Sequence, residues 1–191
     1  MGHSQAGKAE NRARILDEAA RQVRRDGLEA VSVGALMKSV GLTHGGFYGH
    51  FESRSALLAE ALGRALEEGR ARSQAHFPDG PPDLVARVSA YLSPSHRDAR
   101  ETGCAMAALL SDVGRADEGA RSVMQDYVES LIQRLTAELG GDEARAMMVV
   151  SAMIGGLALS RVFTDERRAD ALLEAVRDSL LALDQPATTL D

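Results

Sequence analysis

The stretch VSVGALMKSVGLTHGGFYGHFESRSALL occupies residues 31–58, and its caps and glycines predict two short helices joined by a tight turn. Ser32 stands where an N-cap precedes the apolar residues of the first short helix, and Gly41 ends that helix. Thr43 is a second candidate N-cap and opens a very short helix. Two such helices are the sequence form of a helix-turn-helix, although a helical hairpin with no role in DNA binding has the same periodicity.

Helical periodicity continues on both sides of this stretch. Apolar residues at helical spacing predict a helix over about 10–26 that Gly27 ends, and another helix that Ser53 caps. The proline- and glycine-rich segment 77–82 is typical of a linker. Beyond it we predict five helices, at about 83–93, 99–114, 117–139, 142–163 and 166–183. The fold is therefore predicted to be all-α, with about nine helices.

The composition is that of an ordinary globular protein. Of 191 residues, 45% are hydrophobic and 26% are charged. Cys104 is the single cysteine, which excludes a disulfide within the chain. The N-terminal segment lacks a secretory apolar region, and no apolar run approaches the roughly 18 residues of a membrane-spanning helix, so a cytoplasmic location is expected.

The net charge of −6 is unusual for a DNA-binding protein, but the charge is unevenly distributed. Residues 1–56 hold eight basic and six acidic residues, a net charge of +2, whereas the rest of the chain carries −8. A slightly basic N-terminal part and an acidic body favour a DNA-facing head, although the excess is small.

Residues 31–58 resemble the DNA-binding signature of the TetR family. The matching features are the capped short helix, Gly-hydrophobic-Thr at 41–43, Tyr-x-His-Phe at 48–51 and Leu-Leu at 57–58. Arg54 is a departure, because the family usually has Lys there. The resemblance implies a three-helix helix-turn-helix domain at 1–56 and a helical ligand-sensing and dimerisation domain at 57–191.

This resemblance also implies a function. The chain would be a homodimeric repressor that binds double-stranded operator DNA and leaves it when an inducer acts on the C-terminal domain. The alternative is an all-helical small-molecule-binding or enzyme-like protein that binds no operator.

The DNA-binding residues follow from chemistry and resemblance together. His44 is the candidate for a base contact, with a solvated loop histidine as the alternative, and Tyr48 is a candidate phosphate contact, with a core residue as the alternative. Gly45 and Gly46 would let the backbone approach the groove. The complete predicted set is Ser32, Thr43, His44, Gly45, Gly46, Tyr48, His50 and Arg54.

The body is predicted mainly by resemblance, which implies a cavity in each subunit and a dimer interface made by the last two helices. Small residues at Gly155 and Gly156 would permit close approach there. Candidate cavity residues, each of which could equally be ordinary core, are Tyr91, Met106, Leu109, Met124 and Tyr127.

The Gly-Cys step at 103–104 resembles a TetR branch that responds to electrophiles or oxidants through a cysteine. Arg161 stands at the position of that branch's basic residue, where Lys is expected. A nearby cation favours the reactive thiolate. The alternative is a small buried Cys104 and an inducer that binds non-covalently.

Catalysis and metal binding find little support. The histidines at 76 and 96 have no partner at metal-ligand spacing, and no glycine-rich phosphate loop occurs. We therefore expect no cofactor, no metal and no enzymatic activity.

Overall fold

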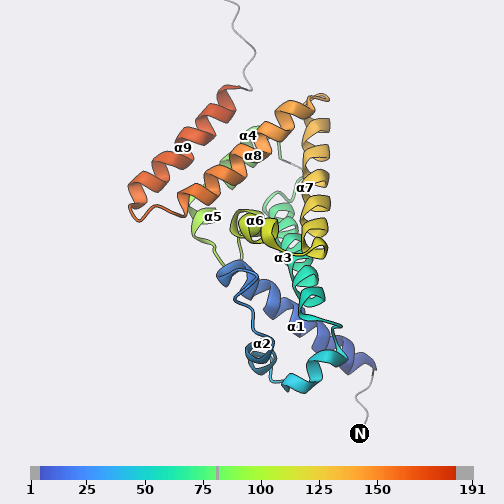
Figure 1. Cartoon of the computed structure of the whole chain (residues 1–191). Coiled ribbons are helices and arrows are strands. Elements are labelled where there is room, and N and C mark those ends of the chain that lie inside the picture. Colours follow the sequence, from blue (N-terminus) through green and yellow to red (C-terminus); the bar gives the residue numbers. More distant parts are fainter. Residues whose placement is uncertain (1–4, 81, 184–191) are drawn as a thin grey trace, which may run out of the picture. The chain divides into compact units, whose positions relative to one another are not determined.

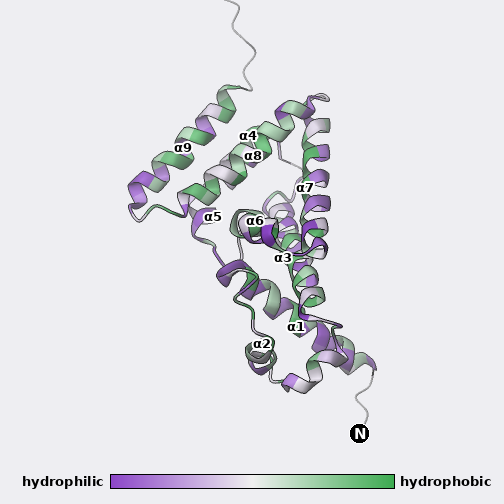
Figure 2. Cartoon of the chain, in the orientation of Figure 1, coloured by the Kyte–Doolittle hydropathy of each residue, from purple (hydrophilic) through white to green (hydrophobic). Residues whose placement is uncertain are grey.

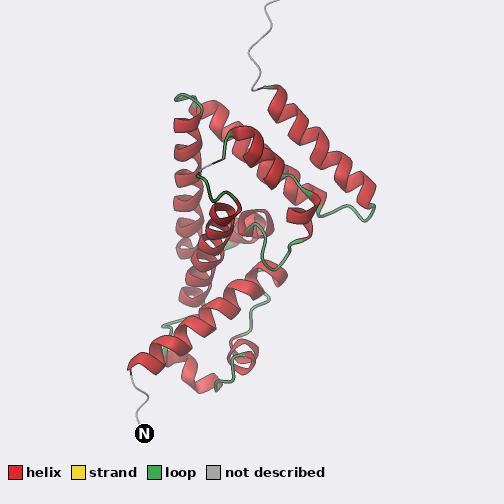
Figure 3. Cartoon of the chain, turned by 180° about the vertical axis from the view of Figure 1, so that it is seen from behind, coloured by secondary structure: helices red, strands yellow, loops and turns green. Residues whose placement is uncertain are grey.

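The computed structural model describes residues 5–80 and 82–183, and within them it contains helices and loops but no strand (Figure 3). The prediction of an all-α fold is confirmed. The chain divides into two compact units, one made by Met1–Arg72 with Arg100–Tyr127 and the other by Ser73–Ala99 with Val128–Asp191. This is a division by packing, and the functional boundary after residue 56 stays a prediction.

The first unit holds α1 (Gln5–Asp26), α2 (Val33–Ser39), the 3₁₀ helix η1 (His44–Gly49), most of α3 (Arg54–His76), α6 (Ala105–Arg115) and the start of α7 (Glu118–Glu138) (Figure 1). α1 buries one stripe that includes Ile15, Ala19 and Val23. It ends as predicted at Gly27, whose φ is +89° and whose N–H donates to the carbonyl of Val23 at 3.0 Å.

The second unit holds the end of α3, then α4 (Leu84–Tyr91), α5 (Pro94–Asp98), the rest of α7, α8 (Glu143–Ser160) and α9 (Glu166–Ala182). α8 is hydrophobic along most of its length, whereas α9 carries hydrophilic residues between its apolar ones (Figure 2). The two helices pack together, and Leu157 and Leu173 are buried in that packing.

α8 is long and apolar enough to cross a membrane by length and composition, although no apolar run of that length was expected from the sequence. Its 18-residue window is 44% buried against the protein's own helices. A single helix of this kind is weak evidence for a membrane span, because the core helix of a soluble protein passes the same test.

The predicted single helix over 99–114 is wrong in its first part. The chain forms the short α5 at 94–98, leaves it through residues 99–104, and starts α6 at Ala105. Ser93 caps α5 by accepting from the N–H of His96 at 3.3 Å, and Pro94 occupies its first turn, so a separate short helix forms before residue 99 and α6 starts six residues later than predicted.

Candidate nucleic-acid interface

α2 and η1 are joined by the tight turn that the sequence predicts. Gly41 has a φ of +73°, and the N–H of Leu42 donates to the carbonyl of Met37 at 2.8 Å. This pattern closes the C-terminus of α2 as a Schellman motif, which requires a left-handed residue. The buried side chains of Leu36 and Phe47 hold the two helices against each other.

The predicted recognition segment lies on the surface of the first unit. Thr43, His44, Gly45 and Gly46 are all exposed. Tyr48 is 70% exposed whereas its neighbour Phe47 is 1% exposed, so the alternative of a core tyrosine is excluded. The Tyr48 ring lies edge-on to the Phe47 ring, with centroids 5.2 Å apart, which supports the side chain on a rigid base.

Ser32 and Thr43 occupy the predicted N-cap positions, but neither side chain makes the capping hydrogen bond. Both residues are exposed and have extended backbone conformations. Because their hydroxyls are not used to cap the helices, they are suited to donate to a phosphate oxygen at a helix N-terminus.

Packing within the chain does not require glycine at positions 45 and 46. A Cβ at Gly45 would meet no atom within 4 Å, and one at Gly46 would meet the Thr43 hydroxyl at 3.6 Å, an ordinary contact. Neither residue has a positive φ. The lack of side chains at Gly45 and Gly46 leaves this part of the exposed surface without projecting groups, and the packing of the fold does not depend on it.

His50 follows η1 and is half-buried. Its Nδ1 atom is buried and has no hydrogen-bond partner. Burial, followed by the positive charges of Lys8 and Arg12, lowers the pKa of the imidazole. The free protein therefore holds a largely neutral histidine beside two cations, a position where an added anion would favour protonation.

Arg54 turns toward the chain's own backbone. Its guanidinium donates to the carbonyls of Leu28, Glu29 and Val31 at 3.0–3.2 Å. These bonds tie the loop between α1 and α2 to the start of α3. A phosphate contact by Arg54 stays a prediction, and it would compete with these bonds.

Two arginines of α1 hold the helix-turn-helix in place, a role that the sequence prediction did not assign. Arg14 donates to the carbonyl of Val40 at 2.7 Å, at the end of α2. Arg12 donates to the carbonyl of His50 at 3.4 Å, stacks 4.8 Å from the centre of the Phe51 ring and pairs with Glu60. In the sequence they look like ordinary charges on a solvated helix face.

The family model for "Bacterial regulatory proteins, tetR family" matches residues 15–61, which include α2, η1 and the helices that support them. The chain therefore carries a segment within its first unit that matches the TetR family model. Over 86 residues it is 30% identical to the HTH-type transcriptional regulator AcrR of Shigella flexneri. That alignment covers 44% of this chain and 40% of AcrR, so less than half of the relative's length is spanned.

Solved structures extend the likeness to most of the chain. A transcriptional regulator from Cytophaga hutchinsonii matches 95% of this chain and 98% of its own, with a TM-score of 0.77 and 17% identity. The reduced form of NemR from Escherichia coli matches 89% of this chain and 95% of its own, with a TM-score of 0.72 and 19% identity. At such identities the likeness concerns the fold alone.

The predicted sensor residues are divided between the two units. The first unit contains Cys104, Met106, Leu109, Met124 and Tyr127, of which the first four are buried. Tyr91 and Arg161 belong to the second unit. Their common role in one ligand site stays a prediction.

Cys104 and Arg161 each have an anchored position. The Cys104 sulfur accepts from the N–H of Ala107 at 3.4 Å, as the N-cap of α6. The Arg161 guanidinium donates to the carbonyls of Arg97 and His96 at 3.0 and 3.3 Å. Arg161 thereby holds the end of α5 to the end of α8.

Proposed function

We propose that this protein is a cytoplasmic, non-enzymatic transcriptional repressor that binds operator DNA as a homodimer. The proposal rests chiefly on the exposed surface of Thr43, His44, Gly45, Gly46 and Tyr48, in a segment that matches the TetR family model. Hydroxyl, imidazole and phenol groups on a smooth short helix can contact phosphates and base edges in a major groove. Such a surface has no evident use in a catalyst or in a purely structural protein.

A gel-shift assay with the protein's own upstream region tests the proposal. Tyr48→Ala should weaken binding to all sequences by a similar factor, because a phosphate contact carries no sequence information. His44→Ala should instead change the preference at one base position. Unchanged operator affinity in both variants would show that another surface contacts DNA.

The proposed dimer uses an exposed stripe on α8 and the turn that follows it. On α8, Met148 and Leu159 are 38% and 57% exposed, and the small half-buried residues Ala152 and Gly155 lie between them at helical spacing. Val162, in the turn after the helix, is 76% exposed. Open space at Gly155 would allow a second copy to approach closely. A two-fold protein suits DNA recognition because two half-sites lie about one helical turn apart.

Leu159→Glu tests this interface, because two buried carboxylates at a two-fold contact would repel each other. The variant should sediment as a monomer with its helical content intact and should bind the operator weakly. Glu143→Gln, on the exposed first turn of α8, is the matched surface control. A wild-type protein that sediments as a monomer at micromolar concentration would contradict the proposal.

Release from DNA is proposed to follow the action of a small-molecule or thiol-reactive inducer on the body. The buried methionines Met106 and Met124, which belong to the same unit as Cys104, suit an adaptable apolar site for a non-covalent ligand. The thiol-reactive class is proposed on Cys104, the single cysteine of the chain, whose sulfur accepts from the N–H of Ala107 at the N-cap of α6.

Cys104→Ser separates the two classes. Under one dose of an electrophile such as a maleimide, wild type should release the operator and Cys104→Ser should retain it. Equal release, or no release by either protein, would leave a non-covalent ligand as the inducer.

A further inference from the structure

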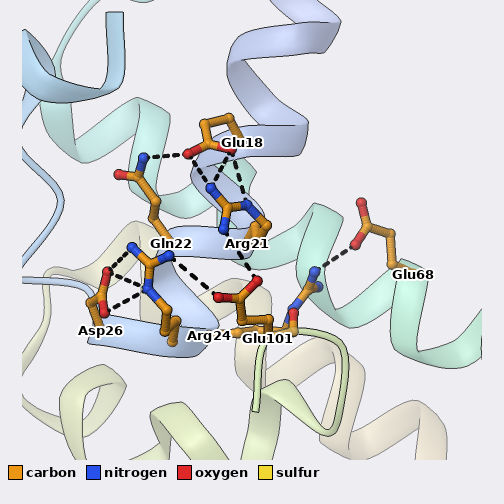
Figure 4. Close-up of polar contacts among 8 residues, drawn as sticks. Glu18, Arg21, Gln22, Arg24, Asp26, Glu68 and Glu101 are labelled. Carbon is orange, nitrogen blue, oxygen red and sulfur yellow. Dashed lines mark hydrogen bonds and ion pairs between the residues drawn. The ribbon is translucent and has the colours of Figure 1, made fainter. Parts of the chain in front are cut away.

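A polar cluster joins the second half of α1 to the loop that precedes α6, within the first unit (Figure 4). Glu101 is its centre, because Arg21 and Arg25 both donate to its carboxylate, at 3.1 and 3.3 Å. These two ion pairs hold the pKa of the Glu101 carboxyl below its usual value. Two successive turns of α1 are therefore attached to one acidic residue of the loop.

Arg24 adds a buried contact to the exposed ion pairs between α1 and the loop. Its side chain is buried, and its guanidinium donates to the backbone carbonyl of Glu101 at 2.5 Å. It also donates to Glu68 at 2.8 Å and to the carbonyl of Ala65 at 3.2 Å, both on α3. The loop is consequently held at its backbone as well as at its side chain, and α3 shares the same anchor.

A second tie lies on α6 itself. The carboxylate of Asp112 accepts from the N–H of Leu28 at 3.1 Å, directly after the end of α1. A Cβ on Gly27 would lie 2.6 Å from the same carboxylate, so the close approach depends on glycine. The segment from Glu101 to Asp112 thus contacts the C-terminal end of α1 at two separate points.

The opposite end of α1 holds the helix-turn-helix through Arg12 and Arg14, which donate to the carbonyls of His50 and Val40. One helix is therefore fixed at one end to the segment 101–112 and at the other end to the proposed DNA-reading surface. A helix is stiff along its axis, so a displacement of one end changes the position of the other.

We infer that Glu101 is a positioning residue for DNA binding. Its ion pairs with Arg21 and Arg25 fix the direction of α1, and through α1 they fix the orientation of α2 and η1. Loss of these pairs lets α1 sample more orientations, and operator binding must then select one of them at an entropic cost. This inference rests on the proposed function.

Operator affinity of Glu101→Gln is the first test. The variant keeps the size of the side chain and removes the charge, so it should bind the operator about fivefold more weakly or worse. Glu67→Gln is the matched control, because Glu67 forms an exposed ion pair with Arg70 on α3 at 2.7 Å and its ion pair does not involve α1. Wild-type affinity in Glu101→Gln, or an equal loss in Glu67→Gln, would overturn the inference.

A double-mutant cycle shows whether the effect passes through the ion pairs. Arg21→Gln combined with Glu101→Gln should weaken operator binding by less than the sum of the two single losses, because either change alone removes the Arg21–Glu101 ion pair, while Arg21→Gln also removes the bonds of Arg21 to Glu18. Additive losses would overturn the inference. A failure of the proposed function is distinguishable, because wild type would then not bind the operator and Tyr48→Ala would have no effect.

Amide hydrogen exchange gives a readout that a merely stabilising role would not change. In wild type, operator binding should slow exchange in residues 99–112 as well as in α1, because the two segments are coupled. In Glu101→Gln at saturating operator, the slowing in 99–104 should disappear while that in η1 remains. Equal slowing of 99–104 in both proteins would count against the inference.

Discussion

At the residue scale, the DNA-facing surface is distinguished by side chains that the fold does not need. Tyr48 is 70% exposed, and Gly45 has open space where a Cβ would be. Residues that only stabilise a fold are normally buried or paired. A large exposed aromatic side chain and two glycines within a helix do not stabilise the fold in this way. This contrast leads to a prediction about Gly45.

Gly45→Ala should separate folding from binding. The added methyl meets no atom of the chain and reduces the entropy of the unfolded state. The free energy of unfolding should therefore stay constant or rise by about 0.5 kcal/mol. The same methyl should weaken operator binding several-fold if the backbone approaches the groove closely. Gly69→Ala, on α3 with equally open space, should leave operator affinity unchanged. Wild-type affinity in Gly45→Ala would contradict the close approach.

Operator binding should depend on pH through His50. Its pKa lies below the usual 6.5 in the free protein, because of burial and then the charges of Lys8 and Arg12. A bound phosphate raises that pKa, so the complex holds more protons than the free protein, and affinity should increase as pH falls from 7.5 to 6. His50→Asn should flatten this dependence in fluorescence anisotropy titrations. An equal pH slope in wild type and variant would exclude His50 as the titrating group.

At the scale of elements, the structure changes the predicted role of Gly156. The sequence places it with Gly155 in a small-residue patch between subunits, but Gly156 packs inside its own unit. A Cβ there would lie 3.2 Å from Val176 on α9 and 3.4 Å from Leu92, at the end of α4. Gly156 therefore sets the close packing of α8 on α9, while Gly155 faces open space.

Gly156→Ala should consequently destabilise the fold and leave the association of subunits unchanged. Overpacking costs about 1–3 kcal/mol, and the better helix propensity of alanine returns about 0.5–1 kcal/mol. A melting temperature several degrees below wild type is expected, with unchanged sedimentation at the same concentration. A stable variant that dissociates into monomers would restore the original assignment.

At the scale of the whole molecule, carboxylates with lowered pKa values make stability depend on pH. The pKa of Glu101 is lowered by Arg21 and Arg25, and that of Asp117 by the hydroxyl of Ser55 and the N–H of Ala120. Such groups ionise more readily in the folded chain. Their contribution is present above the unfolded pKa and is lost as pH falls through the folded pKa.

The free energy of unfolding should therefore decrease gradually as the pH falls below about 4.5, the ordinary value for Glu, because these groups are exposed and solvent screens their interactions. Chemical denaturation at pH 7, 5, 4 and 3 measures this change. Asp117→Asn should reduce the steepness, because it removes one of the titrating groups. A free energy that is constant from pH 5 to pH 3 would show that these ion pairs do not stabilise the folded state.

The amino-acid sequence by itself determined the class of the fold, most helix ends and the helix-turn-helix. These features depend on local chemistry: apolar residues at helical spacing, and glycine at 27 and 41 where the backbone has a positive φ. The start of α6 was missed because Ser93 and Pro94 begin a separate short helix, and helical periodicity in 99–104 does not reveal the turn.

Only the tertiary structure decided which groups the arginines bind and which of the small residues lie at a helix contact. In the sequence, Arg12, Arg14 and Arg24 are indistinguishable from solvated arginines and Arg54 is a candidate DNA contact, yet each donates to a backbone carbonyl far along the chain. A long-range contact of this kind leaves no periodic pattern, because its partner is set by how distant helices pack. For the same reason the sequence grouped Gly155 with Gly156, whereas packing placed α9 against only one of them.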